Sequence, residues 1–173
     1  MKHLLFLFLF ASVQGQTYFT EATLPDTLIM LRGTDEMTGK IYLYPSRKLV
    51  CKTEDSQKAV VIWPLISDIW KPTMFVKGIG FGCVEKAVVI FLFEDGSRLD
   101  MTSWNQFNCD GRLLYLLDAE DWAILANRPL KKIRLTNGNN QESLTEAVDA
   151  EDRTYFIRLM RLLAQKRAFE YRD

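Results

Sequence analysis

The side chains able to do chemistry in this 173-residue chain are restricted in kind, because its only histidine is His3. Histidine is the usual general base near neutral pH and the commonest metal ligand. Without it, the rest of the chain cannot build Ser-His-Asp or Cys-His catalysis, nor the common catalytic zinc sites. An enzymatic activity would have to use carboxylates, lysine, tyrosine or a thiol alone.

Three cysteines, Cys51, Cys83 and Cys109, allow one disulfide and one free thiol. Three pairings are possible, and we favour Cys83 with Cys109, because a hairpin between them can bring their Cα atoms to the roughly 5.5 Å that a disulfide needs. Cys51 is then the free thiol. The neighbouring Lys48 and Lys52 favour a reactive thiolate, but without a histidine partner a buried and inert Cys51 is the favoured interpretation.

Carboxylates gather between residues 95 and 121, at Asp95, Asp100, Asp110, Asp118, Glu120 and Asp121. Calcium binds such groups, but the spacing matches no EF-hand loop, and turn and cap roles already explain several of them. We therefore predict no metal site. A glycosidase needs two acids roughly 5 to 9.5 Å apart, and Asp100 and Asp110 are the pair that such an enzyme would use.

Four tryptophans, Trp63, Trp70, Trp104 and Trp122, are candidates for stacking on sugars or peptides. Aromatic side chains are more often part of a core, because each buries a large area. Trp104 is the exception, since residues 102–111 (TSWNQFNCDG) are polar and rich in turn residues, and such loops concentrate functional side chains. The candidate binding loop contains Trp104, Asn105, Phe107, Asn108 and Asp110.

Residues 1–15 are typical of a secretory signal peptide. A positively charged start precedes the apolar run of residues 4–10 (LLFLFLF), and Val13 and Gly15 are small residues that signal peptidase accepts. The run is shorter than the about 20 apolar residues of a membrane helix. We expect cleavage after Gly15, a single domain over residues 16–173, and a secreted or periplasmic location.

The region between residues 27 and 135 is predicted to form mainly strands. Its clearest feature is Asp95-Gly96, which joins the apolar run 87–94 to the alternating segment 97–101. Such a pair favours a tight hairpin turn with positive φ. The first arm is apolar on both faces, which predicts a central position in the sheet.

A second predicted strand covers residues 59–63 (AVVIW) and is rich in β-branched residues. We expect Pro64 to end it, because proline cannot donate a ladder hydrogen bond. Residues 65–70 are ambiguous, with a short helix as one interpretation.

Two near-identical segments, LDAED at residues 117–121 and VDAED at 148–152, precede predicted helices. In each, the first aspartate can cap free N–H groups, and the acidic first turn suits the helix dipole. The last helix is predicted over residues 150–169, with an apolar face and a basic face. We interpret the basic face as solvated, with binding to anionic lipid or an acidic partner as the alternative.

Together these elements predict an α+β fold. It is mainly an antiparallel β-sheet, with a short helix and a long C-terminal amphipathic helix packed on it.

Five short motifs follow one another between residues 88 and 163. They are FEDG at 93–96, FNC at 107–109, the helix at 117–125, KIR at 132–134 and YFI at 155–157. In this order the motifs resemble a loose group of exported Bacteroidota proteins of unknown function. The resemblance covers under half of the chain and implies a small exported α+β domain in a bacterial envelope. It implies no catalytic residues.

The sequence therefore predicts a non-enzymatic exported domain that binds a protein or glycan of the cell envelope without a cofactor. Lys and Arg balance Asp and Glu at 22 each, which gives no general attraction to nucleic acid. Two alternatives stay open. One is a carboxylate-based hydrolase of glycans, and the other is an inhibitor or immunity-type protein whose exposed loop blocks a secreted enzyme.

Overall fold

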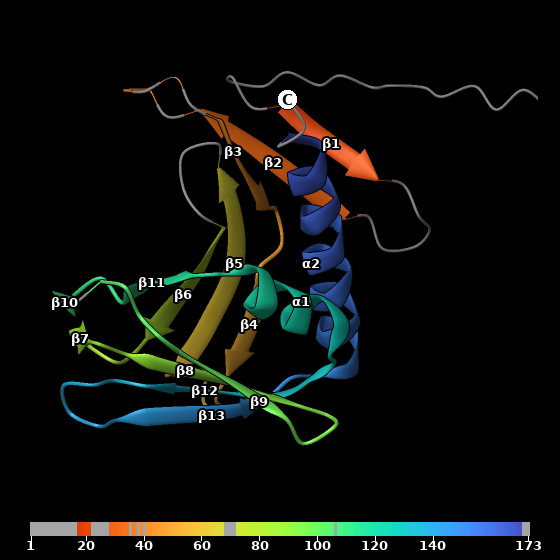
Figure 1. Ribbon diagram of the computed structural model, residues 1–173. Coiled ribbons are helices and arrows are strands. Elements are labelled where there is room, and N and C mark those ends of the chain that lie inside the picture. The colour runs from red at the N-terminus through yellow and green to blue at the C-terminus, as the bar shows by residue number, and fades with distance from the viewer. Residues whose placement is uncertain are drawn as a thin grey trace, which may run out of the picture.

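The computed structural model describes residues 17–21, 28–34, 36–37, 39, 41–67, 72–105 and 107–170. Side chains are described between residues 30 and 164, and the predicted signal peptide with its cleavage after Gly15 lies outside these residues. The described chain forms antiparallel sheets and two helices (Figure 1). This arrangement confirms the predicted α+β class, although the strands divide into separate sheets rather than forming one.

The larger sheet has seven strands in the order β1-β2-β3-β5-β6-β11, and β4 also pairs with β5. Every pairing within it is antiparallel. Its strands are β1 (Thr17–Glu21), β2 (Leu28–Thr34), β3 (Ile41–Pro45), β4 (Leu49–Lys52), β5 (Ala59–Ser67), β6 (Thr73–Ile79) and β11 (Arg112–Leu116).

The smaller sheet has four strands in the order β13-β12-β8-β9. The apolar strand β8 is central, as predicted, and the turn at Asp95-Gly96 leads into β9. A separate two-stranded ribbon pairs β10 with β7. The bounds are β7 (Val84–Glu85), β8 (Val88–Phe93), β9 (Arg98–Thr102), β10 (Phe107–Asn108), β12 (Leu130–Thr136) and β13 (Ser143–Ala147).

The expectation that Pro64 ends a strand is wrong, because β5 continues through it. On one edge, β5 pairs with β4 as far as Ile62 and with β3 from Ile66. Pro64 lies in the gap between these two partners, where the missing N–H is tolerated. Residues 65–67 are therefore strand rather than helix, and residues 68–70 lie outside the described part of the chain.

Both helices begin at the acidic segments that predicted them. Asp118 Oδ1 accepts hydrogen bonds from the backbone N–H groups of Glu120 and Asp121, each at 2.8 Å, and Asp121 caps the Asp118 N–H in return. Asp149 Oδ1 accepts from the Asp152 N–H at 2.8 Å. These caps satisfy the free donors at the starts of α1 (Ala119–Asn127) and α2 (Ala150–Glu170).

The two main sheets and the helices share one continuous apolar core. Helix α2 contacts β5 and contributes Phe156 and Leu163, both 0% exposed. Trp122 of α1 packs beside it and donates its Nε1–H to the carbonyl of Met160 at 3.2 Å. Tyr115 of the larger sheet donates its hydroxyl to the carbonyl of Ala87, next to β8, at 3.1 Å. The core therefore holds the sheets and helices in a defined arrangement.

Candidate binding surface

The candidate loop, residues 102–111, leads from β9 through β10 to β11, on the side of the molecule away from α2 (Figure 1). Trp104 and Phe107 are 66% and 61% exposed. Large aromatic side chains usually gain free energy by burial. Two of them exposed on one loop therefore mark it as a candidate binding surface.

The beginning of the loop is fixed along the edge of β11. The Trp104 N–H donates to the carbonyl of Leu114 at 2.7 Å. The amide side chain of Asn105 then takes the place of a peptide group. Its Nδ2 donates to the carbonyl of Arg112 at 2.9 Å, and its Oδ1 accepts from the Leu114 N–H at 2.8 Å. Asn105 thus holds Trp104 in place.

The end of the loop is fixed by its other two polar candidates. Asn108 Oδ1 accepts from the backbone N–H groups of Asp110 and Arg112, at 2.9 and 3.2 Å. Asp110 Oδ1 accepts from the Arg112 N–H at 2.8 Å, which is the largest cause lowering the pKa of its carboxyl. The structure therefore gives Asn108 and Asp110 roles in shaping the loop, and leaves Trp104 and Phe107 to face solvent.

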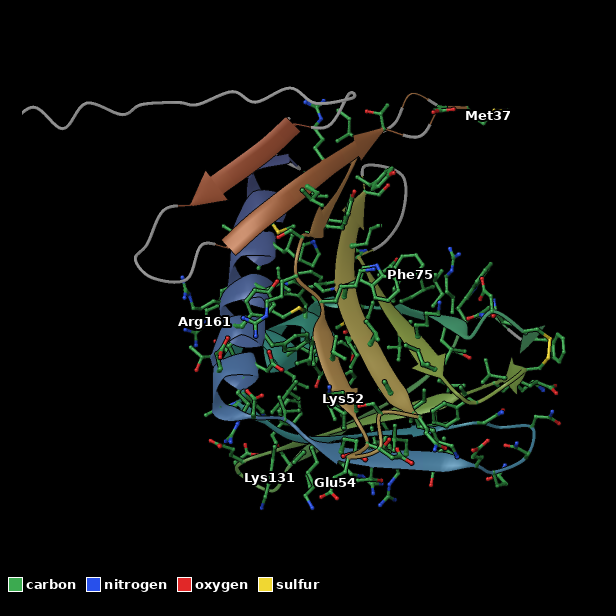
Figure 2. The ribbon with its side chains drawn as sticks, turned by 180° about the vertical axis from the view of Figure 1, so that it is seen from behind. Met37, Lys52, Glu54, Phe75, Lys131 and Arg161 are labelled. Carbon is green, nitrogen blue, oxygen red and sulfur yellow. A yellow bond between two sulfur atoms is a disulfide. The ribbon has the colours of Figure 1, made fainter. Side chains whose placement is uncertain are left out.

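The disulfide expected between Cys83 and Cys109 is present. It lies beside the β7–β10 ribbon at one extremity of the molecule, where Figure 2 shows it as a yellow bond. The backbone around Cys83 is also held by the buried side-chain amide of Asn137. It donates to the Cys83 carbonyl at 3.0 Å and accepts from the Glu85 N–H at 3.2 Å. The loop is therefore tied to both main sheets.

Cys51, the remaining thiol, is 4% exposed within the core. Burial raises the pKa of its thiol to about 12, and the carboxylates of Asp152, Glu146 and Asp149 act in the same direction. Lys48 and Lys52 were expected to favour the thiolate, but burial in the core raises the pKa instead. The structure supports the inert interpretation of Cys51.

We predict that Cys51 does not react with a thiol reagent at pH 8 while the protein is folded. A thiolate is required for that reaction, and a buried thiol with a pKa of about 12 supplies almost none. Absorbance with Ellman's reagent should show no reaction until denaturant is added, and then one equivalent. Rapid labelling of the native protein would contradict the burial of this side chain.

The carboxylates that suggested a hydrolase each have a local partner. Asp100 pairs with Arg98 at 3.2 Å on β9, whereas Asp110 pairs with Arg112 at 3.1 Å in the loop. Asp95 accepts from the Ser97 N–H at 2.9 Å within the hairpin turn. Among the residues that the structure describes, no group of three or more His, Cys, Asp or Glu side chains could hold a metal ion.

Two further tryptophans have defined environments. Trp63 stacks on Phe75, with ring centroids 5.4 Å apart and planes 7° apart, while Lys48 Nζ lies 4.3 Å from the Trp63 centroid. Phe75 comes from β6 and Lys48 precedes β4, on opposite sides of β5, so both ring faces of Trp63 are covered. Trp122 is 5% exposed, and Trp70 lies outside the described residues.

The basic side of α2 is partly engaged within the protein. Arg153 pairs with Glu94, and Arg161 Nε donates to the carbonyl of Ala126 at 2.9 Å. Arg161 also lines an open groove of ≈ 480 Å³ between α1 and α2, together with Trp122 and small side chains. These contacts weaken the hypothesis that α2 presents a free basic face to lipid.

No family model, no curated protein and no solved structure matches this chain. No helix in the part of the chain that the structure describes is long and apolar enough to cross a membrane. The functional argument therefore depends on the surface itself.

Proposed function

We propose that the protein is a non-enzymatic binding domain of the bacterial cell envelope and that the loop of residues 102–111 contacts its partner. One observation carries the proposal. The loop's polar side chains at Asn105, Asn108 and Asp110 are used to fix its backbone, while Trp104 and Phe107 are more than half exposed. The folded chain thus holds two aromatic side chains in water in a defined position.

Such an arrangement suits binding for two physical reasons. Aromatic anchors carry a large part of the free energy of many interfaces. A loop that is already ordered loses little conformational entropy when its partner binds, so more of the contact energy appears as affinity. The disulfide Cys83–Cys109 provides that order and is stable in an oxidising compartment. The resemblance to exported Bacteroidota proteins supports the same setting.

The partner on this proposal is a protein or a glycan of the envelope. An inhibitor or immunity-type protein is one form that this function can take, since it presents a rigid exposed loop to a secreted enzyme. The hydrolase alternative gains no support from the geometry, because Asp100 and Asp110 pair with separate arginines.

The proposal is tested by cross-linking the purified protein into an envelope extract, with the Trp104→Ala/Phe107→Ala variant in parallel. We expect a partner recovered in near-equimolar amount by the wild-type protein, with at least about tenfold less recovered by the variant. Met37→Ala, which removes a side chain that is 94% exposed elsewhere, is the matched control. Equal recovery by all three proteins would refute the role of the loop.

A further inference from the structure

The larger sheet has an outer face that neither helix covers. Its inner face carries the buried side chains of Leu49, Ile62, Val76 and Leu113, which belong to the core. The alternate positions that are not buried form the outer face, which we define as Val50, Lys52, Val61, Trp63, Leu65, Phe75, Lys77, Ile79, Arg112, Leu114 and Leu116. Figure 2 shows Phe75 on the side of β5 and β6 opposite to α2.

Exposed apolar side chains gather on this face. Among the described residues, the exposed large hydrophobic side chains are those of Met37, Val50, Ile79, Trp104, Phe107 and Leu116. Val50, Ile79 and Leu116 belong to the outer face. Trp104 lies beside them at its edge, because its backbone N–H donates to the carbonyl of Leu114. Scattered exposed apolar residues are ordinary, but a contiguous patch marks an interaction site.

The strand register arranges the patch in rows. Trp63, Phe75 and Leu114 lie opposite one another on β5, β6 and β11. Trp104 continues this row, because it bonds to Leu114 and follows Ser103, which is 7% exposed and points inward. At about 4.8 Å between strands, the four residues span about 14 Å. Trp104 is therefore the one residue of the candidate loop that extends this row.

The charged side chains of this surface are of one sign. Lys77 and Arg112 lie opposite each other in the neighbouring row, Lys52 occupies a third position, and Lys48 lies over Trp63. No outer-face position carries Asp or Glu, and Asp110, beside Arg112, is the carboxylate that pairs at its rim. A chain with no net charge therefore presents a locally positive, apolar face.

This combination narrows the choice of partner. A second copy docked face to face would bring the like charges of the two faces together, which costs free energy. A neutral glycan could stack on the exposed Trp104, but Phe75 and Lys48 cover the ring faces of Trp63, and a neutral ligand would make no use of the charges of Lys52 and Lys77. The partner that best matches the apolar and basic side chains of the outer face is an anionic surface with an apolar interior.

We propose that the outer face, with Trp104, docks on an anionic lipid bilayer. Tryptophan favours the interface between headgroups and acyl chains, and the long stems of lysine and arginine keep their charges at the headgroups while lying along apolar surface. Anionic headgroups attract each such cation from the surrounding solution. This inference goes beyond the proposed function, since it concerns a second surface that shares only Trp104 with the loop.

The test is flotation of the purified protein with vesicles of phosphatidylcholine, with and without phosphatidylglycerol, at low and high NaCl. We expect binding only with phosphatidylglycerol, weakened by salt. Lys77→Glu/Arg112→Glu should reduce the partition coefficient at least about tenfold. Lys131→Glu/Lys132→Glu, an equal change of charge at exposed positions of β12, should reduce it less than about twofold. Every variant keeps the same N-terminus, confirmed by mass spectrometry, and its denaturation midpoint checks that it is folded.

Two outcomes would overturn the inference. One is no binding to phosphatidylglycerol vesicles, and the other is an equal loss in the two charge-reversed variants. Neither outcome affects the proposed function, whose test uses the Trp104→Ala/Phe107→Ala variant and an extract rather than lipid. A partner still captured through the loop, without vesicle binding, would leave an acidic protein as the occupant of the outer face.

Discussion

Replacing both Cys83 and Cys109 with serine is expected to lower the free energy of unfolding by about 3.5 kcal/mol. The cross-link closes a loop between residues 26 apart in the sequence. Removing it gives the unfolded chain more conformations, and the chain-entropy relation for a loop of this length yields that value. Urea denaturation followed by circular dichroism measures the change.

Loss of the disulfide should destabilise the ribbon beside it more than the rest of the protein. The ribbon beside the disulfide consists of two residue pairs, Phe107 with Glu85 and Asn108 with Val84. So short a ribbon is not stable by itself. Without the disulfide, we expect faster hydrogen exchange at residues 107–111 and weaker capture of the partner, even where the rest of the protein remains folded.

Cys51→Ala is the matched control, because it removes a sulfur and keeps the cross-link. This substitution leaves a small cavity in the core and should cost about 1 kcal/mol. The serine double variant should therefore unfold at distinctly lower urea than Cys51→Ala. Equal midpoints for the two proteins would show that the disulfide adds little to the folded state.

Local sequence patterns were sufficient for the short-range features of the fold. The hairpin at Asp95-Gly96 and the caps at Asp118 and Asp149 each depend on residues within five positions of one another. The central position of β8 followed from its apolar character on both faces. Physical preferences of neighbouring residues determine all of these features.

The sequence did not predict which strands distant in the chain pair with one another. Pro64 is tolerated because it lies between the partners of β5 on one edge, where β3 ends at Pro45 and β4 begins at Leu49 after a turn at residues 46–48. The periodicity of neighbouring residues does not determine which strands pair at a given edge of another strand. The division into two main sheets has the same origin, because it depends on which strands pair rather than on where strands form.

The outer face was missed for a related reason. The strand at residues 59–63 is apolar on both sides, which is typical of a strand buried on both faces. Whether its second side is covered depends on where the helices pack. The alternation of Phe75, Lys77 and Ile79 with buried neighbours was a usable pattern, since a lysine between two apolar residues predicts an open face. In the loop, Trp104 was singled out as the tryptophan outside the core, and it is exposed. The structural roles of Asn105 and Asp110 depend on hydrogen bonds that the sequence does not show.

Gly111→Ala is expected to lower the free energy of unfolding by about 3 kcal/mol or more. Gly111 has φ +73°, a conformation that costs an L-residue about 1 kcal/mol. A Cβ at this position would also overlap the carbonyl oxygen of Gly78. The Gly78 N–H donates to the Gly111 carbonyl at 3.0 Å, so the two backbones cannot separate without losing that bond. The substitution therefore strains the point where the loop rejoins the sheet.

Gly96→Ala separates the two causes of the stability loss expected for Gly111→Ala, which are the positive φ and the overlap of the added Cβ. Gly96 has φ +83°, and a Cβ there would meet nothing within 4 Å. Its substitution should cost about 1 kcal/mol, from backbone conformation alone. The difference between the two variants in urea denaturation then measures the close approach of Gly111 to Gly78. Equal costs would mean that the backbone at this junction yields easily, and the loop would lack the rigidity on which its proposed binding role depends.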